Sequence, residues 1–310
     1  MKRTLTLRMA PAAANDLERL AQIQQASCTR LGDPISLTTH DLAAMQAWTR
    51  IGPGGVHVIR DDDATVGLLR YARFLDASTP SVLAIVTVDP ERRDSGIADW
   101  TYEQILERAR SDGAAALDTV VDSRDMDTRD FLKHRDFEQL VSVWTMEADP
   151  DSAPAEAPQP PSGLHPRVYR VGEDTALLTD LYNRTFDQHV TFVPSTVEET
   201  RSIETAPGFD PDLTALLETD GGEAVAYART TLRADPNDAW IDMLGVIPKY
   251  QGRGLGRYML LDCMYRLAQA RPHAIRLSVE GTNDRATALY DSEGFMKIRT
   301  RICYRKSLTG

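Results

Sequence analysis

With 310 residues, the chain is long for one compact domain and comfortable for two domains of about 150 residues each. Its formal net charge of −11 argues against a nucleic-acid-binding protein, because such proteins gather lysine and arginine on a surface that faces phosphates. Three scattered cysteines exclude a disulfide framework, and neither they nor the six histidines have the spacing of metal ligands, so no metal is expected.

No apolar run approaches the roughly 20 residues that a membrane-spanning helix needs. Arg8 interrupts the start of the chain before the apolar core of a signal peptide could form. We therefore expect a cytoplasmic protein, a monomer or a homodimer, with neither a membrane nor a nucleic acid as partner.

The predicted elements of the first half begin with an alternating, strand-like stretch at 5–8. A polar helix follows at 15–28, with apolar residues three or four positions apart, and then a loop of low periodicity around 32–39. Val88 ends a later strand, and Arg93–Ala98 is a glycine-containing loop that opens the next helix. That helix has a weakly apolar face.

Residues 149–163 contain five prolines and almost nothing to bury, which predicts a semi-rigid, solvated linker. We therefore expect an N-terminal domain over 1–149, a linker over 150–163 and a C-terminal domain over 164–310.

The second half shows a similar order of elements with a clearer pattern. A strand near 167–170 and a helix at 174–186 precede a loop of low periodicity at 189–211. Two strands joined by a turn at 235–238 come next, and then a helix whose apolar residues recur at every fourth position from 255 to 267. The last predicted elements are a strand, a helix and a strand over 274–279, 283–292 and 296–304. The order β-α-α-β-β-β-α-β-α-β predicts a mixed α/β sheet repeated in tandem.

The two halves repeat each other at an offset of 158 residues. Arg93–Ala98 and Gln251–Gly256 both fit the pattern Gln/Arg-x-x-Gly-x-Gly/Ala between a predicted strand and a predicted helix, and Phe137 and Phe295 keep the same offset. A loop with so little side-chain bulk lets backbone N–H groups converge at the positive end of a helix, which favours a diphosphate ligand. An ordinary tight turn is the alternative explanation.

At these residues the chain resembles the GCN5-related N-acetyltransferase (GNAT) superfamily, as two tandem copies that cover nearly its whole length. The family's stretch Val-x-Pro-x-x-Gln-x-x-Gly-x-Gly is present from Val246 to Gly256. Its second signature, Asn-x-x-Ala-x-x-Leu-Tyr-x-x-x-Gly-Phe, is complete from Asn283 to Phe295. The resemblance implies an α/β fold of two tandem GNAT-like domains, each a mixed, mostly antiparallel twisted sheet flanked by helices. It also implies acetyl-CoA as co-substrate.

By resemblance, the second half binds acetyl-CoA through the end of a strand, the glycine loop and the start of the following signature helix. The residues expected there are Leu244, Gly245, Val246, Gln251, Gly252, Arg253, Gly254, Leu255, Gly256, Arg257, Asn283, Ala286 and Tyr290. A weaker set in the first half is Val88, Arg93, Gly96, Ile97 and Ala98. Because Leu132 and Asp125 stand where the second half has Tyr290 and Asn283, the first half could hold acetyl-CoA without turnover or be purely structural.

Tyr290 is the expected catalytic acid. The resemblance implies that it faces the sulfur of the thioester, and the chemistry agrees. Attack of an amine on a thioester expels a thiolate that needs a proton, and a neutral phenol with an ordinary pKa near 10 can donate one. A core aromatic residue with a satisfied hydroxyl is the alternative explanation.

The reaction also needs a general base. An alkylammonium acceptor with a pKa near 10.4 is neutral only about one part in 10³ at pH 7, so some group must take its proton. Many members of the superfamily carry a glutamate six residues before Val246, where this chain has Trp240. Strand alternation places Trp240, Asp242, Leu244 and Val246 on one face, which makes Asp242 the substitute base. A structural aspartate at a strand edge explains the pattern equally well. Further candidates for the base are Asp238 and Glu280, and His189, in the earlier loop at 189–211, is a candidate for contacting the substrate.

The sequence therefore predicts transfer of an acetyl group from acetyl-CoA to a primary amine of a small molecule, by direct attack in a ternary complex in the C-terminal half. The layout of two copies, with the second more intact, resembles that of the mycothiol synthase type, although Trp240 departs from it. Two alternatives stay open: an acyl-CoA-binding sensor without turnover, and an acetyltransferase of protein N termini or lysines.

Overall fold

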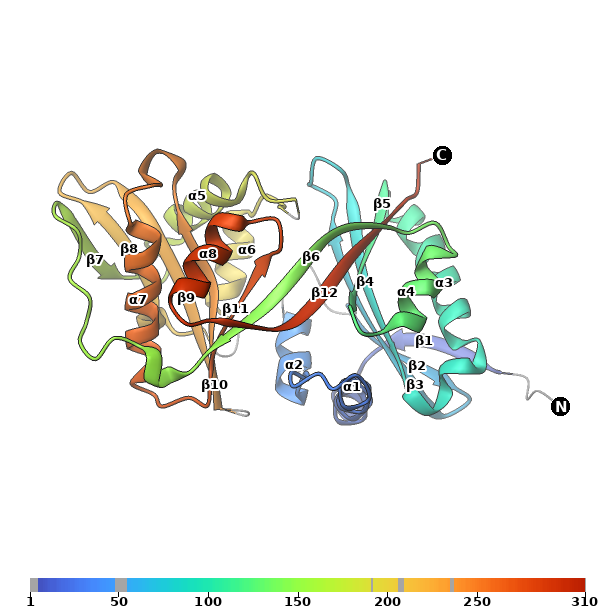
Figure 1. Ribbon diagram of the computed structural model, residues 1–310. Coiled ribbons are helices and arrows are strands. Elements are labelled where there is room, and N and C mark those ends of the chain that lie inside the picture. The colour runs from blue at the N-terminus through green and yellow to red at the C-terminus, as the bar shows by residue number, and fades with distance from the viewer. Residues whose placement is uncertain (1–4, 48–54, 191, 206–208, 235–236, 310) are drawn as a thin grey trace. The chain divides into compact units, whose positions relative to one another are not determined.

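The computed structural model describes residues 5–47, 55–190, 192–205, 209–234 and 237–309. Within these ranges the first half contains β1 (Leu7–Pro11), α1 (Leu17–Leu31), α2 (Thr39–Ala47), β2 (Val56–Asp61), β3 (Ala64–Phe74), β4 (Ser81–Val88), α3 (Ile97–Ser111), β5 (Ala116–Asp122), α4 (Met126–Lys133) and β6 (Glu138–Ala148). The second half contains β7 (Leu164–Val168), α5 (Thr175–Phe186), α6 (Val197–Glu204), β8 (Thr214–Thr219), β9 (Ala224–Ala234), β10 (Asn237–Val246), α7 (Leu255–Ala268), β11 (Ile275–Glu280), α8 (Asp284–Ser292) and β12 (Met296–Ser307). Figure 1 shows these elements along the chain.

Both halves follow the order β-α-α-β-β-β-α-β-α-β, so the predicted tandem α/β fold is confirmed. One helix lies where a loop was expected, because α6 occupies part of 189–211. Its signal is local: the Thr196 hydroxyl accepts a hydrogen bond from the backbone N–H of Glu199, and the Glu199 carboxylate accepts one from the N–H of Thr196. Of the predicted turn at 235–238, residues 235–236 lie outside the described ranges, and Asn237 and Asp238 begin β10.

The chain divides into two compact units, one of residues 1–140 with 301–310 and the other of residues 141–300. These units differ from the predicted domains at their last strands. Strand β6 pairs with β11 from Val143 to Ala148, and the end of β12 pairs with β5 from Arg301 to Ser307. Each half therefore completes the sheet of the other unit. The proline-rich stretch begins directly after β6, but its composition carries no information about which sheet that strand joins.

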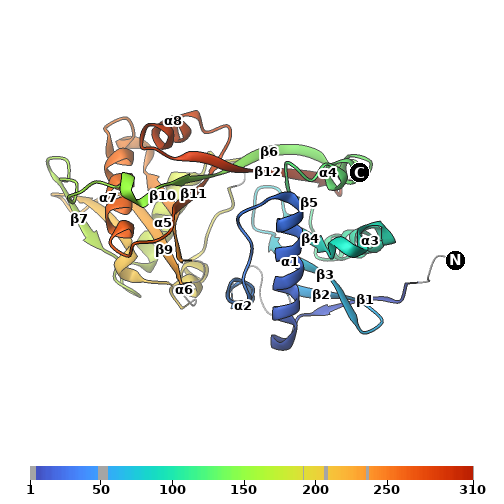
Figure 2. The same ribbon diagram turned by 60° about the horizontal axis from the view of Figure 1, so that its bottom comes forward.

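Each unit has a six-stranded sheet, in the order β1-β2-β3-β4-β5-β12 in the first and β7-β8-β9-β10-β11-β6 in the second. All neighbours run antiparallel except β4 with β5 and β10 with β11. In the second unit, α7 and α8 cover one face of the sheet and α5 and α6 lie on the other (Figure 1). In the first unit, α1 packs across β3 and β4 (Figure 2).

The helix after each predicted diphosphate loop buries the face that its sequence pattern indicates. In α7, Leu255, Met259, Cys263 and Leu267 are all at most 3% exposed. Their counterparts in α3, Ile97, Thr101, Ile105 and Ala109, are fully buried although two of them are small or polar. The Thr101 hydroxyl tolerates this burial because it donates a hydrogen bond to the carbonyl of Ile97, one turn earlier.

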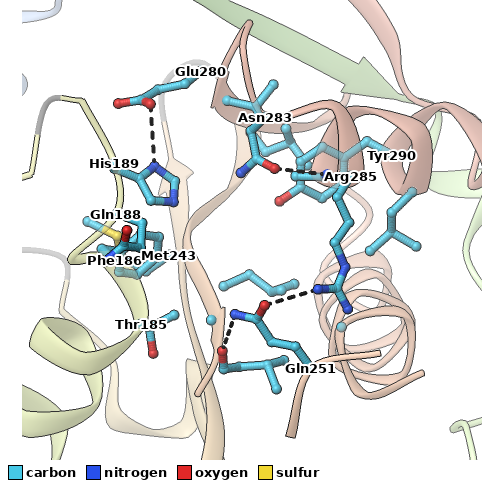
Figure 3. Close-up of a pocket in the computed structure, with 18 of the residues that line it drawn as sticks. Thr185, Phe186, Gln188, His189, Met243, Gln251, Glu280, Asn283, Arg285 and Tyr290 are labelled. Atoms are coloured by element: carbon cyan, nitrogen blue, oxygen red, sulfur yellow. Dashed lines mark hydrogen bonds and ion pairs between the residues drawn. The ribbon is translucent and has the colours of Figure 1, made fainter. Parts of the chain in front are cut away.

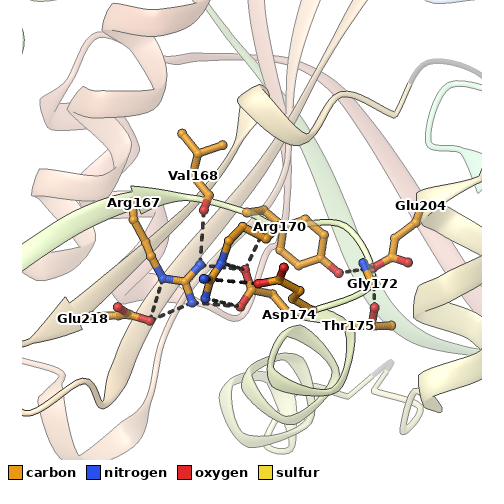
Figure 4. Close-up of polar contacts among 10 residues, drawn as sticks. Arg167, Val168, Arg170, Gly172, Asp174, Thr175, Glu204 and Glu218 are labelled. Atoms are coloured by element: carbon orange, nitrogen blue, oxygen red, sulfur yellow. Dashed lines mark hydrogen bonds and ion pairs between the residues drawn. The ribbon is translucent and has the colours of Figure 1, made fainter.

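A polar network fixes the start of α5 to the sheet of the second unit (Figure 4). Arg167 of β7 donates two hydrogen bonds to the carboxylate of Asp174, at 2.6 and 2.9 Å, and also pairs with Glu218 of β8. Glu204, at the end of α6, accepts hydrogen bonds from Thr175 and Tyr169. Burial would raise the pKa of Asp174, but the hydrogen bonds from Arg167 and Arg170 outweigh it and lower that pKa. The network positions α5, whose far end reaches the candidate site.

Candidate functional site

A cavity of about 860 Å³ opens in the second unit, within the size range of small-molecule sites. Its walls are the end of β10, the loop into α7, the end of β11 with the start of α8, and the end of α5 with the residues that follow (Figure 3).

The cavity exists because two parallel strands separate. The pairing of β10 with β11 covers only Ala239–Ile241 against Ile275–Leu277. Beyond these residues, β10 continues to Val246 paired with β9, while β11 continues to Glu280 paired with β6. The strand edges that face each other in this gap therefore present backbone N–H and C=O groups to the cavity, where an extended ligand with amide groups can pair with them.

A β-bulge breaks the alternation that was expected along β10. The register with β9 shifts between Ile241 and Met243, so Asp242 is the extra residue. Six consecutive residues, Ile241 to Val246, line the cavity, whereas Trp240 does not line it. The expectation that Trp240, Asp242, Leu244 and Val246 share one face was therefore wrong, because strict alternation holds only in an unbroken ladder. Asp242 reaches the cavity by way of the bulge.

The loop before α7 has the geometry expected of a diphosphate site. Gly252 and Gly254 have φ values of +78° and +79°, which side chains other than glycine rarely adopt. Gly254 is the N-cap of α7, a helix of 14 residues, so the positive end of the helix dipole points at this loop. The loop is thus able to bind an anion through backbone N–H groups alone.

Most of the predicted acetyl-CoA residues meet at this cavity. Those that line it are Leu244, Gly245, Val246, Gln251, Gly252, Gly254, Leu255, Gly256, Arg257, Asn283, Ala286 and Tyr290. Arg253 does not line it, and its guanidinium instead donates to the carbonyl of Lys249 and lies 4.8 Å from the centre of the Tyr250 ring. The guanidinium of Arg257 pairs with Glu293 at the end of α8.

Hydrogen bonds hold the side chains at the rim of the loop. Gln251 donates to the carbonyl of Val246 at 3.0 Å and accepts from Arg285 at 3.0 Å, which ties the loop to both β10 and α8. Asn283 caps α8, since its Oδ1 accepts from the N–H of Ala286 at 3.1 Å. Figure 3 shows Gln251, Arg285 and Asn283 around the opening. These contacts preorganise the rim before any ligand is bound.

Tyr290 of α8 lines the cavity with its side chain almost fully covered, at 8% exposure. Its ring packs against Phe295 with centroids 6.0 Å apart. Burial raises the pKa of Tyr290 to about 12, with a smaller contribution from the neighbouring Cys263. The phenol is therefore a neutral proton donor throughout the neutral and mildly basic range.

The other end of the cavity is aromatic and acidic. The ring of Tyr182 contacts those of Phe186 and Phe192, and His189 lies against Phe186 with ring centres 5.0 Å apart. Three carboxylate side chains also line this cavity, those of Asp187, Asp242 and Glu280. An organic cation fits such a surface, because aromatic faces and carboxylates both attract positive charge.

Several of these lining residues were not predicted from the sequence. Thr185 and Phe186 stand at the end of a predicted helix, and Val143 comes from β6 of the first half. Their placement depends on tertiary packing: a Cβ on Gly245 would lie 2.3 Å from the Thr185 side chain, so glycine lets α5 approach β10 closely. Asp238, a further candidate base, pairs with Arg276 and does not line the cavity.

In the first half, the residues that correspond to the diphosphate loop bind one another. Arg93 donates two hydrogen bonds to Asp125, at 3.1 and 2.8 Å, and one to Thr128. Arg30 also lies 3.1 Å from the same carboxylate. Gly96 keeps the left-handed conformation, with φ of +86°, and opens α3 with Ile97 and Ala98 after Val88 has ended β4. The first half thus keeps the shape of the loop, but its arginine is engaged by an internal carboxylate.

Across the described ranges of the chain, no three His, Cys, Asp or Glu side chains are grouped as metal ligands could be. The same ranges contain no helix with the length and hydropathy of a membrane span.

Comparisons with known proteins agree with this geometry. The sequence profile of the acetyltransferase (GNAT) family matches residues 17–137 and 176–295. A mycothiol acetyltransferase of Stackebrandtia nassauensis is 29% identical over 266 residues, 83% of this chain and 84% of that protein. One of Nocardiopsis dassonvillei is 26% identical over 95% of this chain and 96% of its own. Among solved structures, a GCN5-related N-acetyltransferase of Sphaerobacter thermophilus has a TM-score of 0.76 at 20% identity, covering 98% of this chain and 97% of that one. A tandem GNAT protein from the clavulanic acid pathway has a TM-score of 0.73 at 18% identity, covering 98% of this chain and 99% of its own.

Proposed function

The chain belongs to the acetyltransferase (GNAT) family, and we propose that it transfers an acetyl group from acetyl-CoA to a primary amine of a small molecule in the cavity of the second unit. The family match covers both halves, so the chain is an acetyltransferase built from two tandem copies. The family also makes acetyl-CoA the acetyl donor.

The gap between β10 and β11 is the observation that carries the proposal. The pantetheine arm of CoA is an extended chain with two amide groups, and it can add to the free strand edges as a short extra strand would. At one end of the gap, Gly252 and Gly254 offer a backbone cradle to the diphosphate. At the other end, the thioester would lie between Tyr290 and the acidic aromatic wall.

The reaction follows from this placement. The amine attacks the carbonyl carbon of the thioester, the oxyanion that forms accepts hydrogen bonds from backbone N–H groups of β10, and the C–S bond breaks. Tyr290 gives its proton to the departing sulfur. Both reactants occupy the cavity together, so no acetyl group is transferred to the protein. Asp242 and the pair of His189 with Glu280 are the candidates for the base, since all three line the cavity.

The acceptor is proposed to be a small organic cation, because carboxylates and aromatic rings line the end of the cavity where the acceptor would lie. The mycothiol acetyltransferases are relatives at 29% and 26% identity, which makes their acceptor one compound to examine rather than the assigned substrate.

Release of the CoA thiol from acetyl-CoA tests the proposal. The assay compares alkyl amines, arylamines, amino sugars, the acceptor of the mycothiol acetyltransferases and peptides with free N termini. Amine-dependent release with a small-molecule amine supports the proposal. Release only with peptides would instead indicate a protein acetyltransferase, and tight acetyl-CoA binding without release for any amine would indicate a sensor.

A further inference from the structure

We propose that His189, oriented by Glu280, is the group that takes the proton from the acceptor ammonium. This inference rests on the proposed acetyl transfer and assigns its unassigned base. His189 follows the end of α5, and Glu280 ends β11, so the pair joins the two walls between which the acceptor must lie.

The pair is built into the site rather than placed on the surface. Nδ1 of His189 lies 3.7 Å from Oε2 of Glu280, and the two side chains are only 26% and 9% exposed. The same carboxylate oxygen accepts a hydrogen bond from the backbone N–H of Val190 at 3.4 Å, which fixes the segment that carries His189. The ring also packs against Phe186. Figure 3 shows the imidazole between Glu280 and the open centre of the cavity, across from Asn283 and Tyr290.

The position of Glu280 determines which nitrogen can act. A carboxylate beside Nδ1 favours the tautomer that carries its hydrogen there, and this tautomer leaves the lone pair on Nε2, the nitrogen farther from Glu280. The Nδ1 contact of 3.7 Å is long for a hydrogen bond, as catalytic contacts often are before the ligands are bound. Closing that contact in the ternary complex would stabilise the imidazolium that forms when Nε2 accepts a proton.

Asp242 is less well placed for this task. Its carboxylate already accepts a hydrogen bond from the hydroxyl of Thr231 and lies 4.0 Å from the guanidinium of Arg229. The carboxylate already makes both contacts with side chains of β9, and taking up the acceptor's proton would disturb them. Asp242 is better suited to attract the cationic acceptor than to deprotonate it. The other titratable and cationic residues that line the cavity are Tyr182, Asp187, Arg257, Arg285 and Tyr290.

The protons balance with His189 as base. The ammonium gives one proton to Nε2, and the neutral nitrogen attacks the carbonyl carbon of the thioester. The C–S bond breaks as the sulfur takes the proton of Tyr290, and the phenolate recovers a proton from the nitrogen that has become the amide. Of the three hydrogens on the original ammonium nitrogen, one therefore remains on the amide. His189 then releases its proton to solvent. Glu280 exchanges no proton in this sequence of steps and acts as a positioning residue.

The first test compares benzylamine, which is protonated at pH 7, with aniline, which is neutral. We expect His189→Gln to lower kcat/KM for benzylamine by about 10²-fold, the usual size of a general-base effect, and to change it by less than about 3-fold for aniline. Glu280→Gln should lower kcat/KM for benzylamine by a smaller factor than His189→Gln does, and it too should leave kcat/KM for aniline nearly unchanged. His165→Gln and Asp220→Asn are matched controls, because His165 and Asp220 form a 2.6 Å pair on an exposed surface of the same unit and do not line the cavity. Equal losses for both amines in His189→Gln, or a selective loss in Asp242→Asn alone, would overturn the assignment.

A second measurement does not depend on turnover. The ¹⁵N chemical shifts of the His189 ring distinguish its two neutral tautomers in the intact protein. We expect the Nδ1–H form in the wild type and a mixture of both forms in Glu280→Gln. An Nε2–H form in the wild type, or identical spectra in the two proteins, would contradict the proposal. If no amine supports thiol release, the proposed function fails, and the tautomer still decides whether Glu280 orients His189.

Discussion

Replacement of Tyr290 by phenylalanine removes the proposed acid and little else. The hydroxyl belongs to a side chain that is 8% exposed and packed against Phe295, so phenylalanine keeps the apolar contacts and the volume of the ring. We expect acetyl-CoA to bind the variant with nearly unchanged affinity. Turnover should fall, because the departing sulfur then carries its negative charge without a hydrogen-bond donor.

The size of the loss follows from the environment of the phenol. A hydrogen bond to a charged group contributes about 1.5–3 kcal/mol, and each 1.4 kcal/mol is a factor of ten, so kcat should fall by about 10- to 100-fold. Burial raises the pKa of Tyr290 to about 12, which would weaken the acid if the thiol had its value in water. Apolar surroundings also raise the pKa of a thiol, as they do for the buried Cys263. The pKa of the CoA thiol should therefore rise in the same cavity, so that proton transfer from the phenol to the departing sulfur stays feasible.

The assay is release of the CoA thiol at saturating acetyl-CoA, with binding measured separately by calorimetry. Tyr258→Phe is the matched control. Tyr258 lies on α7 in the same core and is 7% exposed, and burial also raises its pKa to about 12. It does not line the cavity. The control should keep kcat within about 2-fold. Equal kcat in Tyr290→Phe and wild type would refute the acid role. A fall in wild-type activity near pH 10 with the titration of a tyrosine would refute the reasoning about burial.

Three further predictions concern stability and assembly. Burial, with the adjacent Arg108 guanidinium 2.7 Å from its Nε2, lowers the pKa of His57 from 6.5 to about 4, so the unfolded chain binds this proton first. The free energy of unfolding should therefore fall by up to about 3 kcal/mol as the pH drops from 6.5 to 4, and His57→Gln should lose this dependence in urea titrations. Asp174→Asn should reduce the free energy of unfolding at pH 7 by about 2 kcal/mol, because Arg167 loses a buried charged partner. The control is Asp180→Asn, which breaks the exposed pair of Asp180 with Arg184 and should reduce the free energy of unfolding by less than about 1 kcal/mol. Since the folded-state pKa of Asp174 is lowered, the Asp174→Asn difference should narrow below pH 3.8, and a constant difference would contradict the ion pair. Finally, a protein cleaved within 153–163 should still elute as one particle in gel filtration, because β6 stays paired with β11 and β12 with β5; separation of the fragments would argue against the exchange.

The order of elements and the backbone shape of the glycine loop before α7 could be predicted from the sequence, because both depend on local chemistry. The glycines at 252 and 254 occupy left-handed conformations, and the apolar face from Leu255 to Leu267 is buried. The offset of 158 residues then extends the same architecture to the first half. Such patterns can be recognised in one sequence because each depends only on residues that are close together along the chain.

Longer-range features were beyond the sequence pattern. The bulge at Asp242 follows from the pairing of β10 with β9, and it changes which side chains face the cavity. The contribution of Val143 depends on a strand that crosses to the other unit, so it lies far from every motif in the second half. His189 and Glu280 are 91 residues apart in the chain and come together only when the segment after α5 packs against the end of β11. Such contacts are set by tertiary packing, which spacing along the chain does not report.

The most direct test of the central claim is a calorimetric titration of the full chain with acetyl-CoA, repeated for Gly254→Val and Gly96→Val. These glycines have φ values of +79° and +86°, and nothing lies within 4 Å of a Cβ added at either, so the two substitutions impose similar strain on the two loops. We predict one equivalent of acetyl-CoA per chain for the wild type, loss of binding in Gly254→Val, and unchanged binding in Gly96→Val, because Asp125 already holds the arginine of the first loop. Loss of binding in Gly96→Val with Gly254→Val unaffected would contradict the assignment of the reaction to the second unit. Two equivalents per chain would contradict the inference that the Arg93–Asp125 contact keeps the first loop from binding acetyl-CoA.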